Sequence, residues 1–179
     1  MLFTETKLKG SYVIDIEQKK DERGFFARSF CEKEFAVHNL SLEIKQSNIS
    51  YNRKKGTLRG MHYQAPPKEE IKLVSCARGA IYDVIIDLRL DSPTYCKWFG
   101  VELSSENFKL LYVPKGFAHG FQALCDDTVV LYQMSEFYHS DCARGFRWDD
   151  PAFSIKWPSN DWIISEKDQK YPLFKENNL

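Results

Sequence analysis

The sequence predicts an all-β protein whose strands form a closed or double-layered sheet. Apolar segments are short and are separated by turn residues at intervals of about 8–12 residues, a spacing typical of β-sandwiches and barrels. In Ala80–Arg89, apolar residues at alternate positions share one face, while Asp83 and Asp87 lie on the other. The segment Thr128–Tyr138 is rich in β-branched and aromatic side chains, which favour strands. Because closure or layering protects the edges of a sheet, we expect one of these two arrangements.

The remaining elements are predicted by similar short apolar segments and by the turn residues between them. Strands are expected, in chain order, at Ser11–Ile16, Ile44–Tyr51, Thr57–Gln64, Ile71–Cys76, Trp98–Leu103 and Phe108–Val113. Helix is expected only briefly, around Glu32–His38 and near the C-terminus. No linker rich in Pro, Gly or Ser divides the 179 residues, and a chain of this length fits one domain with its own core. We therefore predict a single domain over residues 1–179.

Composition and charge argue against several classes of partner. The chain carries 25 Lys+Arg and 25 Asp+Glu, and this zero net charge is unlike that of general binders of nucleic acids or anionic membranes. The longest stretch without a charged residue, Gly116–Cys125, has 10 residues. A membrane-spanning helix needs about 20. We expect neither a nucleic acid nor a membrane as a partner.

The N-terminal segment and the cysteines indicate the compartment. The first ten residues, MLFTETKLKG, contain no apolar core of the kind that a signal peptide has. The five cysteines are an odd number, are irregularly spaced and include no CxxC pair, which is typical of neither a disulfide framework nor a zinc site. The simplest interpretation is a cytoplasmic protein whose thiols stay reduced.

Two segments carry the residues that are most informative about chemistry. The first is Gly56–Gln64, which contains His62 and is followed by Lys72, and the second is Pro114–His119. The pair resembles the two motifs of the cupin superfamily, in which the first motif supplies two His and one Glu to a metal and the second supplies a third His. In this chain Gln64 stands at the second His position and Lys72 at the Glu position.

These two changes predict a site without a metal. A divalent ion prefers deprotonated N, O or S donors, and the ammonium of Lys72 would repel it, which leaves only His62 and His119. A lysine beside a histidine instead places a fixed cation, which can stabilise an oxyanion, next to a base. Strict alternation would put Arg59 on the opposite face from His62, but Gly60 between them is a natural site for a bulge. The alternative is that both histidines are ordinary interior residues and that Arg59 is solvated.

Nearly the whole chain resembles one cupin family, the dTDP-4-dehydrorhamnose 3,5-epimerases. The matching segments are Asp21–Phe26, Gln46–Ser50, Gly56–Gln64, Lys72–Val74, Asp87–Thr94, Val113–Phe121, Leu131–Tyr132, Trp148–Pro151 and Ile164–Asp168. The resemblance implies a cupin-type jelly-roll β-barrel, or double-stranded β-helix, with short flanking helices. It also implies inversion of C3 and/or C5 in a nucleotide-linked 4-keto-6-deoxy sugar, without a cofactor, in deoxysugar and cell-surface polysaccharide biosynthesis.

The resemblance also implies roles for individual residues. His62 would be the base and Asp168 would orient it. Tyr132 would be the acid, and Lys72, with help from Arg59, would stabilise the enolate. Contacts with the sugar, the pyrophosphate or the nucleotide would come from Arg23, Gln46, Asn48, His119 and Lys167, and Phe26 and Tyr138 would pack on the base or the sugar.

Simpler roles remain open for three of these residues. Arg23 follows a turn signal, Tyr132 could be a core aromatic residue, and Asp168 could be a surface charge. The resemblance further implies a homodimer in which an N-terminal strand pairs with the neighbour's sheet, so that residues around Arg23 reach the partner's site.

Two arginines depart from the family pattern. Arg28 and Arg144 stand where relatives usually carry glutamates on the nucleotide side of the site. A guanidinium suits a hydrogen-bond acceptor or an anion, whereas a carboxylate suits a donor. We therefore hypothesise that the substrate is not the usual thymidine-linked sugar and that it is, for example, CDP-linked or carries an extra anionic group. The alternative is that both arginines point to solvent or pair with carboxylates elsewhere.

Other functions also remain open at this stage. The protein could be a mono-epimerase or a ketoisomerase acting on a differently linked 4-keto sugar, a non-catalytic cupin that binds nucleotide sugars, or a metal-dependent cupin oxygenase or isomerase. The presence of both His62 and Tyr132 argues against a pure binder, which needs no paired base and acid.

Overall fold

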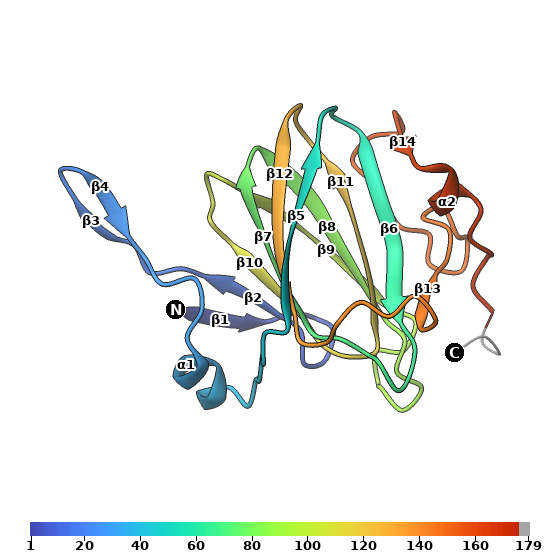
Figure 1. The fold of residues 1–179 in the computed structure, drawn as a ribbon, viewed down its shortest axis with the longest axis horizontal. Coiled ribbons are helices and arrows are strands. Elements are labelled where there is room, and N and C mark those ends of the chain that lie inside the picture. Colours follow the sequence, from blue (N-terminus) through green and yellow to red (C-terminus); the bar gives the residue numbers. More distant parts are fainter. Residues whose placement is uncertain (176–179) are drawn as a thin grey trace.

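Two antiparallel sheets that face each other form the body of the molecule in the computed structural model, which describes residues 1–175 (Figure 1). The first sheet has the strand order β1-β2-β10-β7-β12-β5. Its strands are β1 (Leu2–Glu5), β2 (Tyr12–Asp15), β5 (Gln46–Asn52), β7 (Lys72–Arg78), β10 (Leu110–Val113) and β12 (Thr128–Met134). The predicted domain extends to residue 179, and its last residues, 176–179, lie outside the described part.

The second sheet has the strand order β13-β6-β11-β8-β9, and β14 pairs with β6 in parallel. Its strands are β6 (Thr57–Gln64), β8 (Ala80–Asp87), β9 (Trp98–Ser104), β11 (Phe117–Ala123), β13 (Ala143–Gly145) and β14 (Ile163–Ile164). The chain crosses repeatedly between the sheets: β6 belongs to the second sheet, β7 to the first and β8 to the second again. Residues that lie close together in the sequence therefore reach opposite walls of the interior.

The main hydrophobic core lies between the two sheets. Val74 and Leu111 from the first sheet and Ile81 and Ile85 from the second belong to one buried cluster, and each is 0% exposed. Packing of this kind gives a sheet its stability, because each sheet buries one apolar face against the other. The core therefore joins the two sheets that form the walls of the interior.

A hairpin and two short helices complete the structure. The hairpin of β3 (Lys19–Asp21) and β4 (Gly24–Phe26) projects away from the sheets, and its six strand residues are all exposed (Figure 1). Helix α1 (Glu32–Val37) packs Phe35 into a cluster with residues of β2, β7 and β10, and helix α2 (Glu166–Gln169) follows β14. Within residues 1–175, no helix is long and apolar enough to cross a membrane.

Most of the predicted elements are confirmed. The strand predicted at Thr57–Gln64 has the same bounds as β6, and the predicted helix around Glu32–His38 corresponds to α1. The strand predicted over Thr128–Tyr138 ends earlier, at Met134. Strand β11 was not predicted: all seven of its residues are buried, so both of its faces are covered and no alternation of polar and apolar residues marks it.

The alternation in Ala80–Arg89 suggests a buried apolar face and an exposed polar face, but in the structure both faces are covered. Val84 and Ile86 pack outside the sheet against a cluster that includes Phe146 and Phe153. The other face, which carries Asp83, points into the molecular interior together with the core residues Ile81 and Ile85. Asp83 is 0% exposed, so the polar face of this strand is buried.

Candidate active site

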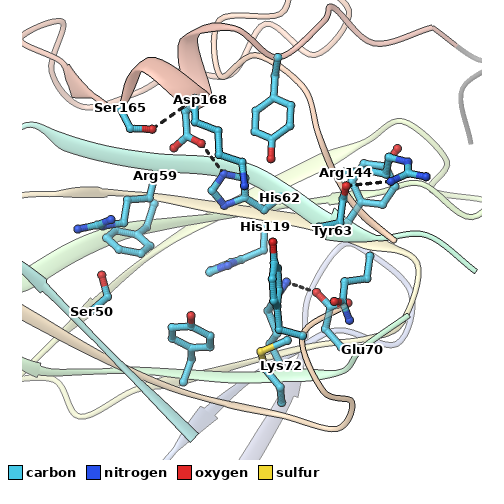
Figure 2. Close-up of a pocket in the computed structure, with 18 of the residues that line it drawn as sticks. Ser50, Arg59, His62, Tyr63, Glu70, Lys72, His119, Arg144, Ser165 and Asp168 are labelled. Atoms are coloured by element: carbon cyan, nitrogen blue, oxygen red, sulfur yellow. Dashed lines mark hydrogen bonds and ion pairs between the residues drawn. The ribbon is translucent and has the colours of Figure 1, made fainter. Parts of the chain in front are cut away.

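A cavity of about 520 Å³ opens between the two sheets. Its walls come from β5, β7 and β12 of the first sheet and from β6, β11 and β13 of the second, and helix α2 adds further lining residues (Figure 2). Nine of the residues singled out from the sequence line it: Arg59, His62, Lys72, His119, Tyr132, Tyr138, Arg144, Lys167 and Asp168. The cavity therefore gathers cations, histidines and tyrosines from segments that are far apart in the sequence.

A bulge in β6 brings Arg59 and His62 to the same cavity. His62 pairs with His119 of β11, whereas Arg59 pairs with Phe121, so three steps along β6 match two along β11. Gly60 lies within this irregularity with φ of +119°, a conformation that favours glycine. The bulge predicted from Gly60 is confirmed, and both side chains line the cavity.

His62 and Asp168 form a hydrogen-bonded pair. The distance from His62 Nε2 to Asp168 Oδ1 is 2.7 Å, and the side chains are 41% and 7% exposed, respectively. The backbone N–H of Gly60 donates to Asp168 Oδ2, and Ser165, the N-cap of α2, accepts from the backbone N–H of Asp168. Because it is buried and bonded to the imidazole, Asp168 is not a surface charge.

The electrostatics of this pair keep the carboxylate ionised. Burial by itself would raise the pKa of Asp168, but the hydrogen bond and charge of His62, together with the bonds from Gly60 and Ser165, bring this pKa below its ordinary value. An ionised Asp168 orients the ring through Nε2 and leaves the other ring nitrogen for a ligand.

Lys72 forms a buried ion pair with Glu70, a residue that sequence analysis missed. The side chains are 10% and 4% exposed, and Lys72 Nζ donates to Glu70 Oε1. Both residues line the cavity, and the second carboxylate oxygen of Glu70, Oε2, is buried without a hydrogen-bond partner (Figure 2). Their spacing of two residues in an extended chain, which puts both side chains on one face, is a signal that could have revealed Glu70.

His119 has a carboxylate partner of its own, which was also missed. The distance from His119 Nε2 to Asp83 Oδ1 is 2.7 Å, and the side chain of Asp83 is fully buried. The regular alternation in Ala80–Arg89 places Asp83 on one face of a strand, but only the pairing of β8 with β11 brings it to His119. Both histidines of the cavity are thus oriented by an aspartate.

Tyr132 and Arg59 face the same interior. Burial raises the pKa of the Tyr132 hydroxyl; the positive charge of Arg59 lowers it and the negative charge of Glu70 raises it further. Arg59 donates to the side-chain oxygen of Asn52 at 2.8 Å and to the backbone carbonyl of Tyr51 at 3.3 Å. Arg59 is therefore held by the protein and is not simply solvated.

The rim of the cavity is built from a loop and from the C-terminal segment. The side chain of Gln64 accepts from the backbone N–H of His139 and donates to the carbonyl of Phe137, so it holds the loop that carries Tyr138. Tyr171 was not predicted as a site residue, but it lines the cavity with its ring 5.7 Å from that of His62. The nearby Tyr171 and Tyr138 raise the pKa of Lys167.

The other residues singled out from the sequence do not line the cavity of the single chain. Gln46 and Asn48 lie beside it, and Gln46 accepts from the backbone N–H of Tyr138 at 2.8 Å. Arg23 and Phe26 lie on the projecting hairpin, where Arg23 forms an ion pair with Asp21 at 2.6 Å. Arg28 forms an ion pair with Glu34, also at 2.6 Å.

The two altered positions of the cupin motifs, Lys72 and Gln64, are both engaged with other groups of the protein. Lys72 occupies one ligand position, and Gln64 is bonded to backbone groups of the rim. Residues 1–175 contain no group of three or more His, Cys, Asp or Glu side chains that could hold a metal ion. The basic side chains that line the cavity are Arg59, Lys72, Arg144 and Lys167.

Comparisons with known proteins agree with this geometry. The family model described as dTDP-4-dehydrorhamnose 3,5-epimerase matches residues 5–176. A protein of that name from Methanothermobacter thermautotrophicus is 44% identical over 178 residues, which is 98% of this chain and 95% of the relative.

Solved structures are also similar to this chain. The Bacillus anthracis dTDP-4-dehydrorhamnose 3,5-epimerase with TDP and PPi bound has a TM-score of 0.94 and 41% identity, over 97% of this chain and 99% of the other. The Legionella pneumophila dTDP-6-deoxy-D-glucose-3,5-epimerase in complex with dTDP-4-keto-L-rhamnose has a TM-score of 0.90 and 36% identity, over 96% and 92% of the two chains. The predicted cupin-type jelly-roll fold is confirmed by this similarity.

Proposed function

Because the chain belongs to the dTDP-4-dehydrorhamnose 3,5-epimerase family, which consists of isomerases, we propose that it inverts both C3 and C5 of a dTDP-linked 4-keto-6-deoxy sugar. One observation carries this proposal: a histidine–aspartate pair, a buried lysine and a partly buried tyrosine line a single cavity. These are the groups that removal and return of a proton beside a ketone require. The reaction belongs to deoxysugar biosynthesis for cell-surface polysaccharides.

In the proposed first step, His62 removes the proton from C3 or C5. The C4 carbonyl acidifies both C–H bonds, and the electron pair of the broken bond moves to O4 to form an enolate. Asp168, ionised and 2.7 Å from His62 Nε2, stabilises the imidazolium that results. Lys72 holds the enolate oxygen with support from Arg59, because a preorganised cation stabilises charge that develops in the transition state.

In the second step, Tyr132 returns a proton to the same carbon from the opposite side. Tyr132 lies on β12 of the first sheet and His62 on β6 of the second, so the two side chains approach the cavity from opposite walls. Burial raises the pKa of Tyr132, which keeps the hydroxyl protonated near neutral pH and able to donate. Removal from one face and return on the other inverts the centre.

For the nucleotide, we propose dTDP, bound near Lys167, Arg144 and Tyr138. The relatives carry dTDP in their names, and the similar Bacillus anthracis structure holds TDP and PPi. The hypothesis of another nucleotide depended on Arg28 and Arg144 together, but Arg28 forms an ion pair with Glu34, which offsets its charge. Competition among dTDP, CDP, GDP and UDP tests this point, and tighter binding of CDP than of dTDP would contradict it.

Proton NMR of dTDP-4-keto-6-deoxyglucose incubated with the protein in deuterated water tests the reaction. We expect the signals of the C3 and C5 protons to disappear as deuterium enters and the epimerised product to form. Loss of only one signal would indicate a mono-epimerase. No exchange on dTDP-, CDP-, GDP- or UDP-linked sugars would favour the non-catalytic binder.

Two variants in the same assay separate the base from the acid. His62→Ala removes the base, so exchange at both carbons is expected to stop. Tyr132→Phe removes the acid, so exchange is expected to continue while inversion slows by about 10²–10⁴-fold. Full epimerase turnover in Tyr132→Phe would show that the acid is another group.

For assembly and location, we propose a cytoplasmic homodimer in which the N-terminal part of one protomer reaches its partner. The projecting hairpin exposes Phe26, which is 70% exposed, and carries Arg23, and both were singled out as ligand contacts. Cys31, Cys76, Cys125 and Cys142 are free thiols, which is typical of a reducing compartment.

A further inference from the structure

Glu70 presents a buried carboxylate oxygen without a partner. Its side chain is only 4% exposed, Oε1 accepts from Lys72, and Oε2 has no hydrogen-bond partner within the described structure. Buried polar groups in proteins are almost always hydrogen-bonded, because an unsatisfied acceptor loses its water without compensation, and the loss is greatest for a charged group. An oxygen of this kind calls for a donor supplied by something else.

The position of Glu70 indicates where that donor comes from. Glu70 lies on the wall of the cavity together with Lys72 and Tyr132, and Figure 2 shows the Glu70–Lys72 pair at one end of the group of residues that line it. Oε2 itself has almost no solvent-accessible area in the structure, so a molecule bound in the cavity reaches it once the Glu70 carboxylate turns toward the cavity that the residue lines. Lys72 and Tyr132 take part in the proposed reaction steps, whereas Glu70 has no part in them.

The pair offers a donor and an acceptor side by side. Lys72 Nζ can only donate, whereas Glu70 Oε2 can only accept while the carboxylate is ionised. A sugar with a ketone at C4 and a hydroxyl at C3 presents the complementary arrangement, an acceptor next to a donor. On the other side of the ketone, C5 bears the methyl group and the ring oxygen and has no donor to offer.

We propose that Glu70 is a specificity-determining residue whose Oε2 accepts a hydrogen bond from the C3 hydroxyl of the substrate while Lys72 holds the C4 oxygen. This inference rests on the proposed function and deepens it: the site selects 4-keto sugars that keep a free hydroxyl beside the ketone. Inversion at C3 moves the hydroxyl, so the contact can form with only one of the two C3 configurations. Its effect is therefore measured in initial rates, before the inverted sugar accumulates.

The test compares Glu70→Gln with the wild type on two substrates, a dTDP-4-keto-6-deoxy sugar and its 3-deoxy analogue. The readout is kcat/KM for deuterium entry at C5, which both substrates allow. In the variant, the amide oxygen stays on Lys72, because the ammonium only donates, so an NH₂ group replaces the acceptor that faces the hydroxyl. We expect the preference for the hydroxylated substrate to fall by about 10–100-fold, the effect of one hydrogen bond to a charged acceptor.

Glu69→Gln is the matched control. Glu69 adjoins Glu70 and is only partly buried, and it does not line the cavity. The control is expected to keep the wild-type preference. If Glu70 only positions or neutralises Lys72, Glu70→Gln slows both substrates by the same factor and the preference stays unchanged, which overturns the inference.

Two further outcomes are also decisive. If Glu70→Gln does not fold, wild type alone gives the answer: exchange at C5 of the 3-deoxy analogue at least about 10-fold less efficient supports the contact, and equal efficiency overturns it. If wild type exchanges C5 of the hydroxylated sugar and Glu70→Gln keeps the same preference between the two substrates, only this inference fails. If wild type exchanges neither substrate, the proposed function fails with it.

Discussion

At the scale of single residues, the cavity pairs each histidine with a buried aspartate. His62 bonds to Asp168 and His119 to Asp83, both at 2.7 Å. Only the pairing with Asp168 is reinforced by the N-cap of a helix, because Ser165 accepts from the backbone N–H of Asp168. A short helix, which packing must support, thus determines where the imidazole points.

Replacing Asp168 by Asn tests this pairing. We expect kcat to fall by about 10²–10⁴-fold with little change in KM, because an amide does not stabilise the imidazolium. We also expect the free energy of unfolding at pH 7 to fall by about 1–3 kcal/mol. Steady-state kinetics and urea denaturation measure the two effects.

The pH dependence gives an independent check on the same residue. The pKa of Asp168 in the folded protein lies below its ordinary value of 3.8, so its contribution to stability is full above that pH. This contribution is lost as the pH falls through the lower pKa of the folded state. The difference in the free energy of unfolding between wild type and Asp168→Asn should therefore shrink in that pH range. Glu166→Gln, whose side chain is 90% exposed on the same helix, should show no such convergence.

At the scale of the element, strand β6 depends on Gly60 for the bulge that brings its site residues to the cavity. A Cβ at Gly60 would lie 2.5 Å from Gly120 Cα and 2.8 Å from the carbonyl oxygen of His119. The close approach of β6 to β11 at the bulge therefore requires a residue without a side chain. The bulge in turn places Arg59 beside His62 at the cavity.

Gly60→Ala and Gly24→Ala separate this close approach from the cost of a positive φ. Both glycines have positive φ, +119° and +130°, but a Cβ at Gly24 would meet nothing within 4 Å. We expect Gly24→Ala to lower the free energy of unfolding by about 1–2 kcal/mol and Gly60→Ala by about 2–4 kcal/mol. Gly60→Ala should also lower kcat/KM at least about tenfold through misplacement of Arg59 and His62. Equal losses of stability in thermal denaturation would show that the contact with β11 is unimportant.

At the scale of the whole molecule, the cavity and the projecting hairpin are separate within one chain. Arg23 and Phe26 lie on the hairpin and do not line the cavity. If these residues contact substrate, a second protomer must bring them there. The proposed homodimer therefore makes a testable statement about which chain completes each site.

Mixed dimers of two inactive proteins test this arrangement. One protomer carries His62→Ala with an intact hairpin, and the other carries Arg23→Ala and Phe26→Ala with an intact His62. If hairpins act on the partner, mixing and reassociation should restore activity, because one site then receives both an intact base and an intact hairpin. Activity that stays at the level of the separate variants, with dimers verified by analytical ultracentrifugation, would show that the hairpin does not complete the partner's site.

The sequence alone was sufficient for much of the fold, and it singled out nine residues that line the cavity. Local alternation predicted β8, a short apolar segment predicted β6, and the glycine between Arg59 and His62 predicted a bulge, because these features depend on neighbouring residues. The motif residues His62 and Lys72 also lie on strands that the pattern located correctly.

Only the tertiary structure decided which charged residues are partners. Glu70, Asp83 and Tyr171 belong to no motif that identified them, and Asp83 reaches His119 only through the pairing of β8 with β11. Likewise, the zero net charge of the chain describes an average over its whole length, whereas the cavity collects Arg59, Lys72 and Lys167 in one place. Periodicity reports which face of a strand a side chain occupies; contacts between distant strands depend on how the sheets pair and close, and these contacts set the charge and the hydrogen bonds of the site.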